Sequence, residues 1–287
     1  MSVPDDLLVE VTGLAAELAS VEPPVVLDVR WRLVGPSGRT DYLAGHLPGA
    51  VFVDLDAELS GPPGPGGRHP LPDPEALQRV LRAAGVRTGR PVVVYDGGDG
   101  TAAARAWWTV RWAGHRQVRV LEGGFGAWAG TGLPVSTEPP AVTPGDVTVR
   151  PGGMPVLDAR AAAEVAAEGV LVDVRAAARY RGETEPVDPV AGHIPGAVNV
   201  PATEYVGPDG RFPAADSLRA RFAEVGVRPG IRVGAYCGSG VTAAQAVLAL
   251  HRAGRSDAAL YVGSWSHWIT DPERPVAVGT DPGPSGP

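Results

Sequence analysis

The sequence predicts an α/β protein of two similar domains, each an open and mostly parallel sheet flanked by helices. One observation is an internal repeat, because long segments of the first half return in the second half at a separation of roughly 140 residues. The other is that short apolar runs, typical of buried parallel strands, alternate with longer helical patterns in each half. A chain of 287 residues with 44% hydrophobic residues is long enough for two such domains.

The repeat consists of four pairs of matching segments that keep the same order in both halves. The pairs are VLDVR at 26–30 and LVDVR at 171–175, GHLPGA at 45–50 and GHIPGA at 192–197, 83–104 and 223–245, and GGFGAW at 123–128 and GSWSHW at 263–268. Between the copies, the stretch 136–153 is rich in proline and glycine and has little apolar periodicity. We therefore expect an N-terminal domain at 1–135, a linker at 136–153 and a C-terminal domain at 154–287. The tail after about residue 271 is expected to be poorly packed.

Each predicted element follows from a local pattern. Strands are expected at the apolar runs 25–29, 91–95 and 118–121, and a turn followed by a short strand is expected at 192–201. A helix is expected to begin after Asp73, because this capping acid precedes Pro74 and Glu75, and to end at Gly85. A second helix is expected over 101–114. Because parallel strands need crossover connections, this order predicts helices on both faces of a sheet.

Composition excludes several classes of function. All 25 basic residues are arginine, so the lysine of a P-loop, of a protein kinase or of a Schiff-base enzyme is missing. With a net charge of -7 and scattered arginines, the chain is not expected to bind nucleic acid. Its apolar runs are too short to span a membrane and its N-terminus carries acidic residues, so we expect a cytoplasmic protein.

The single cysteine, Cys237, marks the main difference between the two halves. One cysteine excludes an internal disulfide, and the six histidines have no metal-binding spacing, so we expect no metal site. Aligning the repeats places Cys237 opposite Asp96, Val241 opposite Gly100 and Thr242 opposite Thr101. Both segments stand where a buried strand ends and a helix begins, which is the ligand-binding edge of a parallel sheet. We therefore expect the second half to react and the first half to support it.

The residues around Cys237 are suited to holding a thiolate. Gly238 and Gly240 allow the backbone to curl so that successive N–H groups point at the sulfur. The helix expected over 241–254 directs its positive end to the same place, which also favours the ionised thiol. The same N–H groups would hold an extra sulfur atom or an anionic substrate group on Sγ. A buried cysteine that fills space as a small apolar residue is the structural alternative.

Two GHxPGA motifs, the CGSGVTA loop at 237–243 and the terminal GSWSHW together resemble the two-domain rhodanese family of thiosulfate and 3-mercaptopyruvate sulfurtransferases. The resemblance covers about residues 7–271 and implies two tandem rhodanese-like domains. It implies that the C-terminal domain is active through Cys237 and that the N-terminal domain, with Asp96 in place of cysteine, is inactive. It further implies that Cys237 takes sulfur from a donor as a persulfide and passes it to cyanide, a thiol or thioredoxin. No metal or organic cofactor is implied.

The resemblance also assigns residues to the sulfur donor. The neutral residues after Cys237 are similar to those of mercaptopyruvate enzymes, whereas thiosulfate enzymes more often carry two basic residues there. Ser239, His69 and Asp56 match a Ser-His-Asp relay, which would handle a proton as the enolate of pyruvate leaves. Arg179 matches a substrate-binding arginine and would grip a carboxylate through two parallel hydrogen bonds. The loop completes the expected substrate site with Gly238, Gly240, Val241 and Thr242.

One departure from the family pattern leaves the donor open. Mercaptopyruvate enzymes often carry a second arginine where this chain has Val187 and Asp188, so thiosulfate:cyanide sulfur transfer remains the alternative main activity. Arg181 is a candidate to replace the missing arginine. Each assigned residue also has a structural alternative, namely a solvated loop for His69, a turn for Ser239, a helix cap for Asp56 and the surface for Arg179.

Two other classes of protein compete with the sulfurtransferase hypothesis. A cysteine phosphatase or arsenate reductase also uses a thiolate in an anion-binding loop, but it requires an arginine at the position of Ala243. A non-catalytic sulfur carrier or binding module would tolerate the loss of Ser239, His69 and Arg179, all of which are present. Steady-state turnover separates a carrier from an enzyme, because a carrier shows none.

Overall fold

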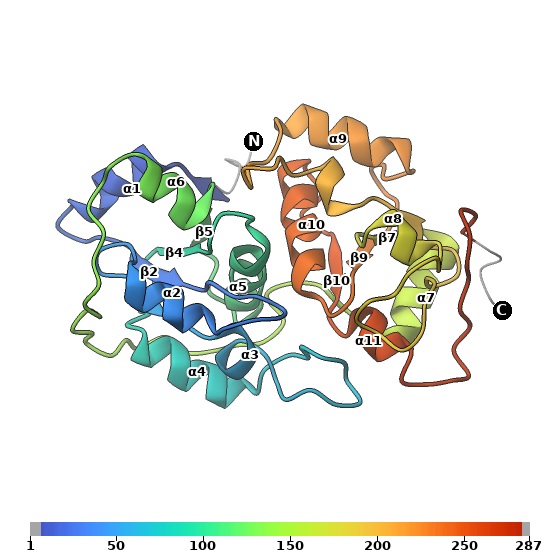
Figure 1. Ribbon diagram of the computed structural model, residues 1–287, viewed down its shortest axis with the longest axis horizontal. Coiled ribbons are helices and arrows are strands. Elements are labelled where there is room, and N and C mark those ends of the chain that lie inside the picture. Colours follow the sequence, from blue (N-terminus) through green and yellow to red (C-terminus); the bar gives the residue numbers. More distant parts are fainter. Residues whose placement is uncertain (1–6, 283–287) are drawn as a thin grey trace. The chain divides into compact units, whose positions relative to one another are not determined.

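The computed structural model describes residues 7–282, which form two compact α/β units, each with one five-stranded sheet (Figure 1). The described part of the first unit is 7–61, 71–154 and 208–211, and that of the second is 62–70, 155–207 and 212–282. The loop at 62–70 therefore belongs to the second unit, although it lies in the N-terminal half of the sequence. The outer ends of the two predicted domains, residues 1–6 and 283–287, lie outside the described residues.

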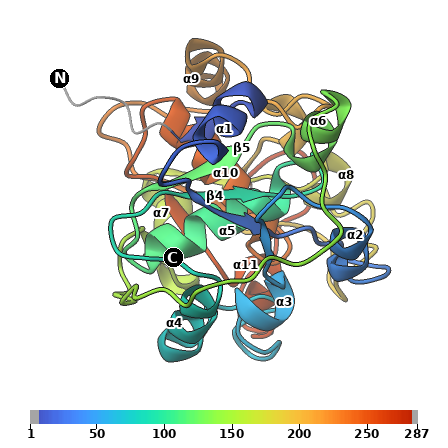
Figure 2. The ribbon, with the colours of Figure 1, turned by 90° about the vertical axis from the view of Figure 1, so that its left-hand side faces the viewer.

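The first sheet has the strand order β1-β5-β4-β2-β3, and all of its pairs are parallel. The elements are β1 (Leu8–Val9), α1 (Val11–Leu18), β2 (Val25–Asp28), α2 (Gly38–Ala44), β3 (Val51–Phe52), α3 (Leu55–Glu58), α4 (Pro74–Ala83), β4 (Val92–Tyr95), α5 (Thr101–Trp112), β5 (Val118–Leu121) and α6 (Gly124–Gly130). Val93 and Tyr95 of β4 join a core with α1 and α6 on one face. Helix α5 packs on β4 and β5 from the other face, so both faces of this sheet are covered (Figures 1 and 2).

The second sheet repeats this arrangement with the strand order β6-β10-β9-β7-β8, again entirely parallel. The elements are β6 (Val156–Leu157), α7 (Ala159–Glu168), β7 (Val170–Asp173), α8 (Ala177–Tyr180), β8 (Val198–Asn199), a 3-10 turn η1 (Ala202–Glu204), α9 (Ala215–Glu224), β9 (Val233–Tyr236), α10 (Val241–Arg252), β10 (Ala259–Tyr261) and α11 (Ser264–Trp268). Tyr236, Tyr261 and Trp265 lie in a buried core with α7, while α10 packs on β9 and β10. The equal strand orders confirm the predicted duplication and fold class.

The helix predicted after Asp73 begins where its capping pattern indicated. The Asp73 carboxylate accepts the N–H of Ala76 at 2.8 Å, Pro74 is the first helical residue, and Gly85 follows the helix with a φ of +82°. The described helices α5 and α10 have 12 residues each, whereas about 20 are needed to cross a bilayer. Within 7–282, no helix is long and apolar enough to span a membrane.

The alignment of the two loops at the carboxyl ends of β4 and β9 needs a correction of one residue. Helix α5 begins after Gly100, whose φ is +72°, and α10 begins after Gly240, whose φ is +81°. Gly100 therefore corresponds to Gly240 and not to Val241, so the loop after Asp96 is one residue longer than the loop after Cys237. The sequence alignment missed this shift because both loops consist of small residues that match in either register.

The described part of the tail after about residue 271 is poorly packed, as expected, because none of its side chains is buried and Val278 is 66% exposed, but its backbone is paired with the rest of the unit. Ala277 and His193 form an antiparallel bridge, with N–H to carbonyl distances of 2.8 and 2.9 Å. The N–H of Gly279 also donates to the carbonyl of Arg181 at 2.9 Å. Backbone pairing with a buried turn holds this segment, although its sequence has few apolar residues.

Candidate active site

Cys237 is the first residue after β9, in the short loop that leads into α10. The N–H of Gly240 donates to Cys237 Sγ at 3.1 Å, and the whole residue Cys237 is only 3% exposed. Since α10 begins at Val241, with Thr242 next, the positive end of the helix lies at the same loop. A directed N–H and a helix N-terminus both stabilise negative charge on a sulfur atom or on a group bound to it.

Ser264, the first residue of helix α11, fixes the backbone of the cysteine loop. The N–H of Cys237 donates to Ser264 Oγ at 3.1 Å, and the Ser264 hydroxyl donates to the carbonyl of Tyr261 at 2.8 Å. Ser264 has a φ of +53°, and within 7–282 it is the one non-glycine residue with a positive φ. Its counterpart in the first unit, Gly124, has the same φ. A strained serine is therefore kept where the sister unit has glycine, and its hydroxyl holds the cysteine backbone.

The 62–70 loop places His69 next to Ser239, which follows Cys237 by two positions. His69 Nδ1 lies 2.7 Å from Ser239 Oγ, and both residues are almost fully buried. The loop is anchored by a bridge between Gly64 and Gly67 and by the N–H of Arg68, which donates to Ser266 Oγ at 3.1 Å. The structure thus brings together two of the three predicted relay residues within the second unit.

Asp56, the third predicted relay residue, belongs to the first unit. It is the second residue of α3, and its carboxylate accepts the indole N–H of Trp31 at 2.8 Å. Asp54, not Asp56, caps this helix, because Asp54 accepts the N–H groups of Asp56 and Ala57. The helix-cap alternative for Asp56 is therefore wrong, while its partnership with His69 stays a prediction.

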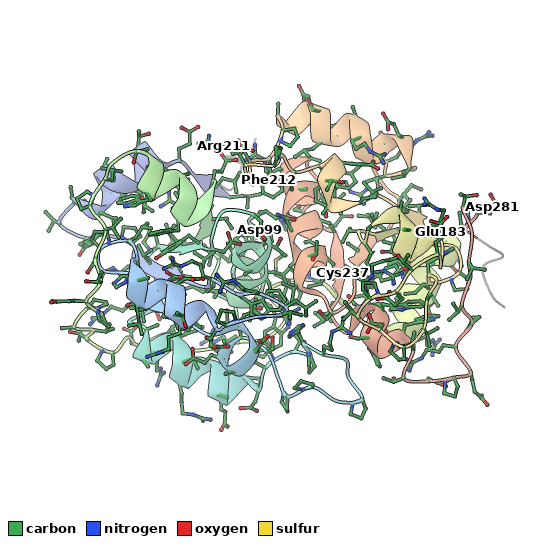
Figure 3. The ribbon with its side chains drawn as sticks, viewed as in Figure 1. Asp99, Glu183, Arg211, Phe212, Cys237 and Asp281 are labelled. Carbon is green, nitrogen blue, oxygen red and sulfur yellow. The ribbon has the colours of Figure 1, made fainter. Side chains whose placement is uncertain are left out.

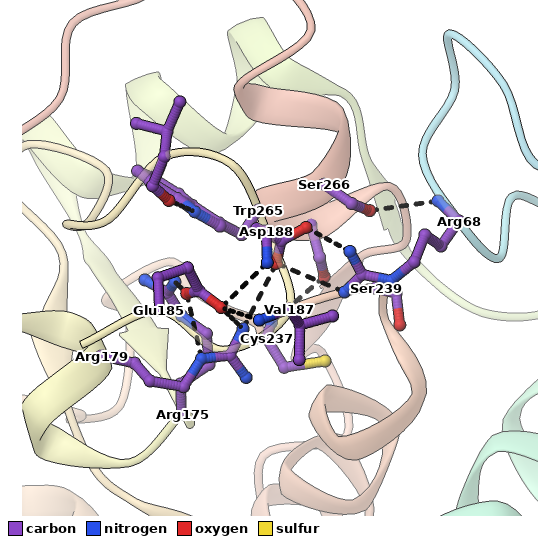
Figure 4. A network of polar contacts seen from close by, with 12 residues as sticks. Arg68, Arg175, Arg179, Glu185, Val187, Asp188, Cys237, Ser239, Trp265 and Ser266 are labelled. Atoms are coloured by element: carbon purple, nitrogen blue, oxygen red, sulfur yellow. Dashed lines mark hydrogen bonds and ion pairs between the residues drawn. The ribbon is translucent and has the colours of Figure 1, made fainter. Parts of the chain in front are cut away.

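Arg179 lies in a cluster of charged side chains beside the cysteine loop, which we call the arginine–acid cluster (Figure 4). Its members are Arg68, Arg175, Arg179, Glu185 and Asp188. Arg179 donates to Glu185 at 2.6 and 3.0 Å and to Asp188 at 3.2 Å. Burial alone would raise the pKa of Glu185, but the hydrogen bonds from Arg179 and from two backbone N–H groups outweigh it and lower that pKa. Glu185 is therefore charged near neutral pH.

Arg68 is a residue near the cysteine that our sequence analysis missed. Its guanidinium pairs with Asp188, and a Cβ placed on Gly238 would lie 2.9 Å from Arg68 Nη2 and 3.6 Å from Arg179 Nη2. Two guanidinium groups therefore reach the residue that follows Cys237. Arg181, the expected replacement, instead donates to Glu183, which lies well away from Cys237 within the second unit (Figure 3).

In the equivalent loop of the first unit, the side chain of Asp96 takes the place of the cysteine. The Asp96 carboxylate accepts the N–H groups of Gly98, Gly100 and Ala103 at 2.9, 3.1 and 3.1 Å. Complete burial raises the pKa of Asp96 to about 6, because it outweighs these three hydrogen bonds. The N–H groups of this loop thus bind a carboxylate in one unit, and in the other the N–H of Gly240 donates to a sulfur atom.

Metal and phosphatase chemistry have no matching residues here. In the part of the chain that the structure describes, no three histidine, cysteine or acidic side chains form a metal site. Ala243, at the position where a cysteine phosphatase needs an arginine, is a fully buried residue in the first turn of α10. The loop therefore lacks the cation that grips an oxyanion in those enzymes.

The structure therefore defines a protein of two similar parallel α/β domains. One of them carries a buried cysteine in the loop at the carboxyl end of a central strand. The family profile described as "Rhodanese-like domain" matches residues 11–131 and 156–271. The chain therefore belongs to the rhodanese-like domain family, with two copies of the domain.

Several relatives match over nearly the full length of this chain. The chain is 46% identical to SseB of Mycobacterium tuberculosis, provisionally named a thiosulfate sulfurtransferase, over 98% of this chain and 100% of that protein. It is 48% identical to a Pseudomonas aeruginosa protein provisionally named a 3-mercaptopyruvate sulfurtransferase, over 93% of this chain and 96% of that one. The crystal structure of SseA from Escherichia coli, described among 3-mercaptopyruvate enzymes, matches with a TM-score of 0.80 and 33% identity, over 90% of this chain and 98% of that one.

Proposed function

We propose that this protein is a sulfurtransferase that moves a sulfur atom from 3-mercaptopyruvate through a Cys237 persulfide to a thiol or to cyanide. The observation that carries the proposal is the 2.7 Å contact between His69 and Ser239 beside the cysteine loop. It pairs a hydroxyl with an imidazole next to the cysteine that we propose as the nucleophile. The names of the relatives support the same class of reaction.

The proposed first half-reaction forms one S–S bond and breaks one C–S bond. The Cys237 thiolate attacks the thiol sulfur of the donor, and the electron pair of the C–S bond leaves on carbon as the enolate of pyruvate. The outer sulfur keeps its hydrogen, so the enzyme becomes a persulfide. The outer sulfur then loses this proton, which is passed to the enolate carbon and completes pyruvate, and the loop N–H groups hold the charge of the resulting persulfide anion.

In the second half-reaction, the acceptor takes the outer sulfur. A thiolate or cyanide ion attacks it, the S–S bond breaks, and its electron pair returns to Cys237 as the thiolate. Since the chain has one cysteine, no second thiol of the same chain can resolve the persulfide. We propose thioredoxin or another external thiol as the acceptor, in a cytoplasmic setting.

Ser239 and His69 are the proposed proton carriers of the first half-reaction. The hydroxyl contacts the departing enolate, and the imidazole exchanges a proton with the hydroxyl. We propose that Asp56 orients the imidazole of His69 and stabilises its protonated form, as in a Ser-His-Asp relay. Thiosulfate needs no such proton, because its leaving group is sulfite.

The charge of the arginine–acid cluster favours a donor with one negative charge. Arg68 and Arg179 pair with Asp188 and Glu185, and Arg175 pairs with Glu185 and with the buried Asp173, so each positive charge here is matched by a negative one. Binding of doubly charged thiosulfate would need uncompensated cations, and the two residues after Cys237 are neutral. Thiosulfate:cyanide transfer is the second candidate activity, favoured by the name of the Mycobacterium tuberculosis relative.

The experiment that tests the proposal compares kcat/KM for 3-mercaptopyruvate and thiosulfate with cyanide as the acceptor, for the wild type and for Cys237→Ser. We expect turnover with a preference for 3-mercaptopyruvate in the wild type and none with either donor in the variant. A preference for thiosulfate would select the second candidate. Absence of turnover with both donors and with thiol acceptors would identify a non-catalytic sulfur carrier and overturn the proposal.

A further inference from the structure

Tyr205 carries a buried hydroxyl that has no hydrogen-bond partner within residues 7–282, and the whole residue is 0% exposed. The chain has six tyrosines, all of them among the described residues. The hydroxyls of the other five take part in hydrogen bonds, namely those of Tyr42, Tyr95, Tyr180, Tyr236 and Tyr261. A buried polar group without a partner costs stability, so a group of this kind indicates a role outside the resting fold.

Backbone hydrogen bonds place Tyr205 near the cysteine loop. The N–H of Val174 donates to the carbonyl of Tyr236, the residue before Cys237, at 3.1 Å. The N–H of Ala202, the first residue of η1, donates to the carbonyl of Val174 at 3.2 Å, and the N–H of Tyr205 donates to the carbonyl of Ala202 at 3.2 Å. The turn η1 also packs on α10, which begins directly after the cysteine loop. Three successive hydrogen bonds therefore link Tyr205 to the residue next to the proposed nucleophile.

The ring of Tyr205 is packed, and its hydroxyl stays protonated. The ring lies against Phe222 of α9, with 5.7 Å between the ring centroids. Burial raises the pKa of Tyr205 well above its usual value of 10, and the negative charges that Cys237 and Asp173 can carry raise it further. Because the interaction between two charges weakens with distance, the effect of Cys237 indicates that the phenol and the sulfur are neighbours. Near neutral pH the phenol is therefore a hydrogen-bond donor and not a base.

The unit without a cysteine also lacks this phenol. In the first unit α3 takes the place of η1, because α3 follows β3 as η1 follows β8. Helix α3 ends at Glu58, which is followed by Leu59, and the Glu58 carboxylate accepts the N–H of Asp54 at 2.7 Å. The phenol and the cysteine thus occur together in one unit, and the other unit has neither of them at these places.

A persulfide on Cys237 would bring a new acceptor to this region. In the resting protein, Sγ accepts the N–H of Gly240, and no hydrogen bond joins Sγ to the described Tyr205 hydroxyl. A persulfide adds a second sulfur about 2.05 Å from the first. In the persulfide anion this sulfur is charged, and a charged acceptor forms the stronger hydrogen bonds. Because Cys237 is only 3% exposed, protein atoms make up most of its surroundings.

We propose that the Tyr205 hydroxyl donates a hydrogen bond to the outer sulfur of the Cys237 persulfide, the partner that it lacks in the resting protein. This inference rests on the proposed function and adds a side-chain donor to the N–H groups of the cysteine loop. Tyr205 is then a catalytic residue of the sulfur-carrying state, since its hydroxyl contacts the transferred atom.

The first test is Tyr205→Phe, which removes only the hydroxyl oxygen. In ping-pong kinetics, kcat/KM for the donor reports formation of the persulfide, and kcat/KM for cyanide reports its breakdown. We expect the donor value to fall about tenfold, as for the loss of one hydrogen bond to a charged group, and the cyanide value to stay the same or rise.

The two proposals fail in different ways in this experiment. An unchanged donor value, or an equal fall in both values, would overturn the inference and leave the proposed function intact, provided that the wild type forms the persulfide. A wild type that forms no persulfide would overturn the proposed function, and this inference with it.

Stability separates a catalytic hydroxyl from a structural one. Because the hydroxyl has no partner in the resting protein, Tyr205→Phe should unfold at the same urea concentration as the wild type or at a higher one. The matched control is Tyr42→Phe, which removes a hydroxyl that donates to the carbonyl of Ala50 at 2.9 Å in the first unit. It should unfold at a lower urea concentration and keep its kinetics. A loss of stability in Tyr205→Phe as large as that of the control would contradict the inference.

Two further measurements examine the contact itself. The pH profile of Cys237 alkylation by iodoacetamide should be the same in the wild type and in Tyr205→Phe, because the hydroxyl is not bonded to Sγ before sulfur is loaded. In protein labelled with fluorotyrosine, the fluorine NMR signal that is missing from Tyr205→Phe should shift when the persulfide forms and return when cyanide removes the sulfur. A signal that does not move on persulfide formation, or an altered alkylation profile, would overturn the inference.

Discussion

His69 and Ser239 are separated by 170 residues in the sequence, yet Nδ1 of the histidine lies 2.7 Å from the serine hydroxyl oxygen. The histidine reaches this position because the 62–70 loop belongs to the second unit and is held there by Ser266. A buried imidazole bonded to a hydroxyl next to the proposed nucleophilic cysteine is an arrangement for moving a proton during nucleophilic attack.

Removal of this imidazole should affect the two sulfur donors differently. We expect His69→Ala to lower kcat/KM for 3-mercaptopyruvate by roughly 100-fold, a typical loss for a general acid or base, and to change thiosulfate much less. The measurement is steady-state kinetics with both donors on the same enzyme preparation. Equal losses for both donors would argue against a proton relay.

The same pair can be tested for concerted action. The hydroxyl and the imidazole are proposed to work as one unit. The double variant His69→Ala/Ser239→Ala should therefore be only slightly less active than the less active of the two single variants. Losses that multiply in the double variant would mean that the two residues act independently.

Ser264 should affect stability in two opposite ways, because its left-handed backbone is strained while its hydroxyl fixes the cysteine loop. We expect Ser264→Ala to lower the free energy of unfolding by about 1–3 kcal/mol, because the buried N–H of Cys237 loses its acceptor while the left-handed backbone remains. Ser264→Gly loses the same hydrogen bond but relieves the strain, so it should be more stable than Ser264→Ala by about 1 kcal/mol. Urea denaturation measures both, and an alanine variant as stable as the glycine variant would contradict stored strain.

Asp96 should make the protein less stable as the pH rises through the acidic range. Its folded pKa of about 6 exceeds the usual 3.8, so the folded state binds the proton more tightly than the unfolded state between these values. The stability of Asp96→Asn relative to the wild type should therefore increase between about pH 4 and pH 6, by an amount on the order of 3 kcal/mol. Urea denaturation of both proteins at several pH values measures this difference.

The opposite dependence of stability on pH would contradict a raised pKa of Asp96. If its three backbone hydrogen bonds outweighed burial, the pKa would fall below 3.8, and the wild type would instead gain stability relative to Asp96→Asn as the pH rises. A difference that does not vary with pH would mean that burial and hydrogen bonding cancel.

Local patterns in the sequence were sufficient to predict the fold. The apolar strands and the cap at Asp73 depend on neighbouring residues, and the repeat is found by matching one stretch of sequence with another, so the order of the amino acids alone reveals them. The cysteine loop could be predicted for the same reason, since Cys237, Gly240 and α10 follow one another directly.

Contacts between distant segments could not be predicted in this way. Arg68 was overlooked because nothing in its neighbourhood indicates that it pairs with Asp188, which is 120 residues away. The role of Ser264 depends on a backbone angle that a serine rarely adopts, and the order at Ala277 depends on pairing with His193. These features arise from tertiary packing, which periodicity and capping patterns do not encode.

The most direct test of the account is mass spectrometry of the intact protein after brief treatment with 3-mercaptopyruvate and removal of excess donor. We predict an added mass of about 32 Da, one sulfur atom, located on the peptide that contains Cys237 and released by cyanide or a thiol. The Cys237→Ser variant should show no such addition. Turnover by the wild type without this adduct, or an adduct on the Cys237→Ser variant, would contradict a persulfide at this residue as the intermediate.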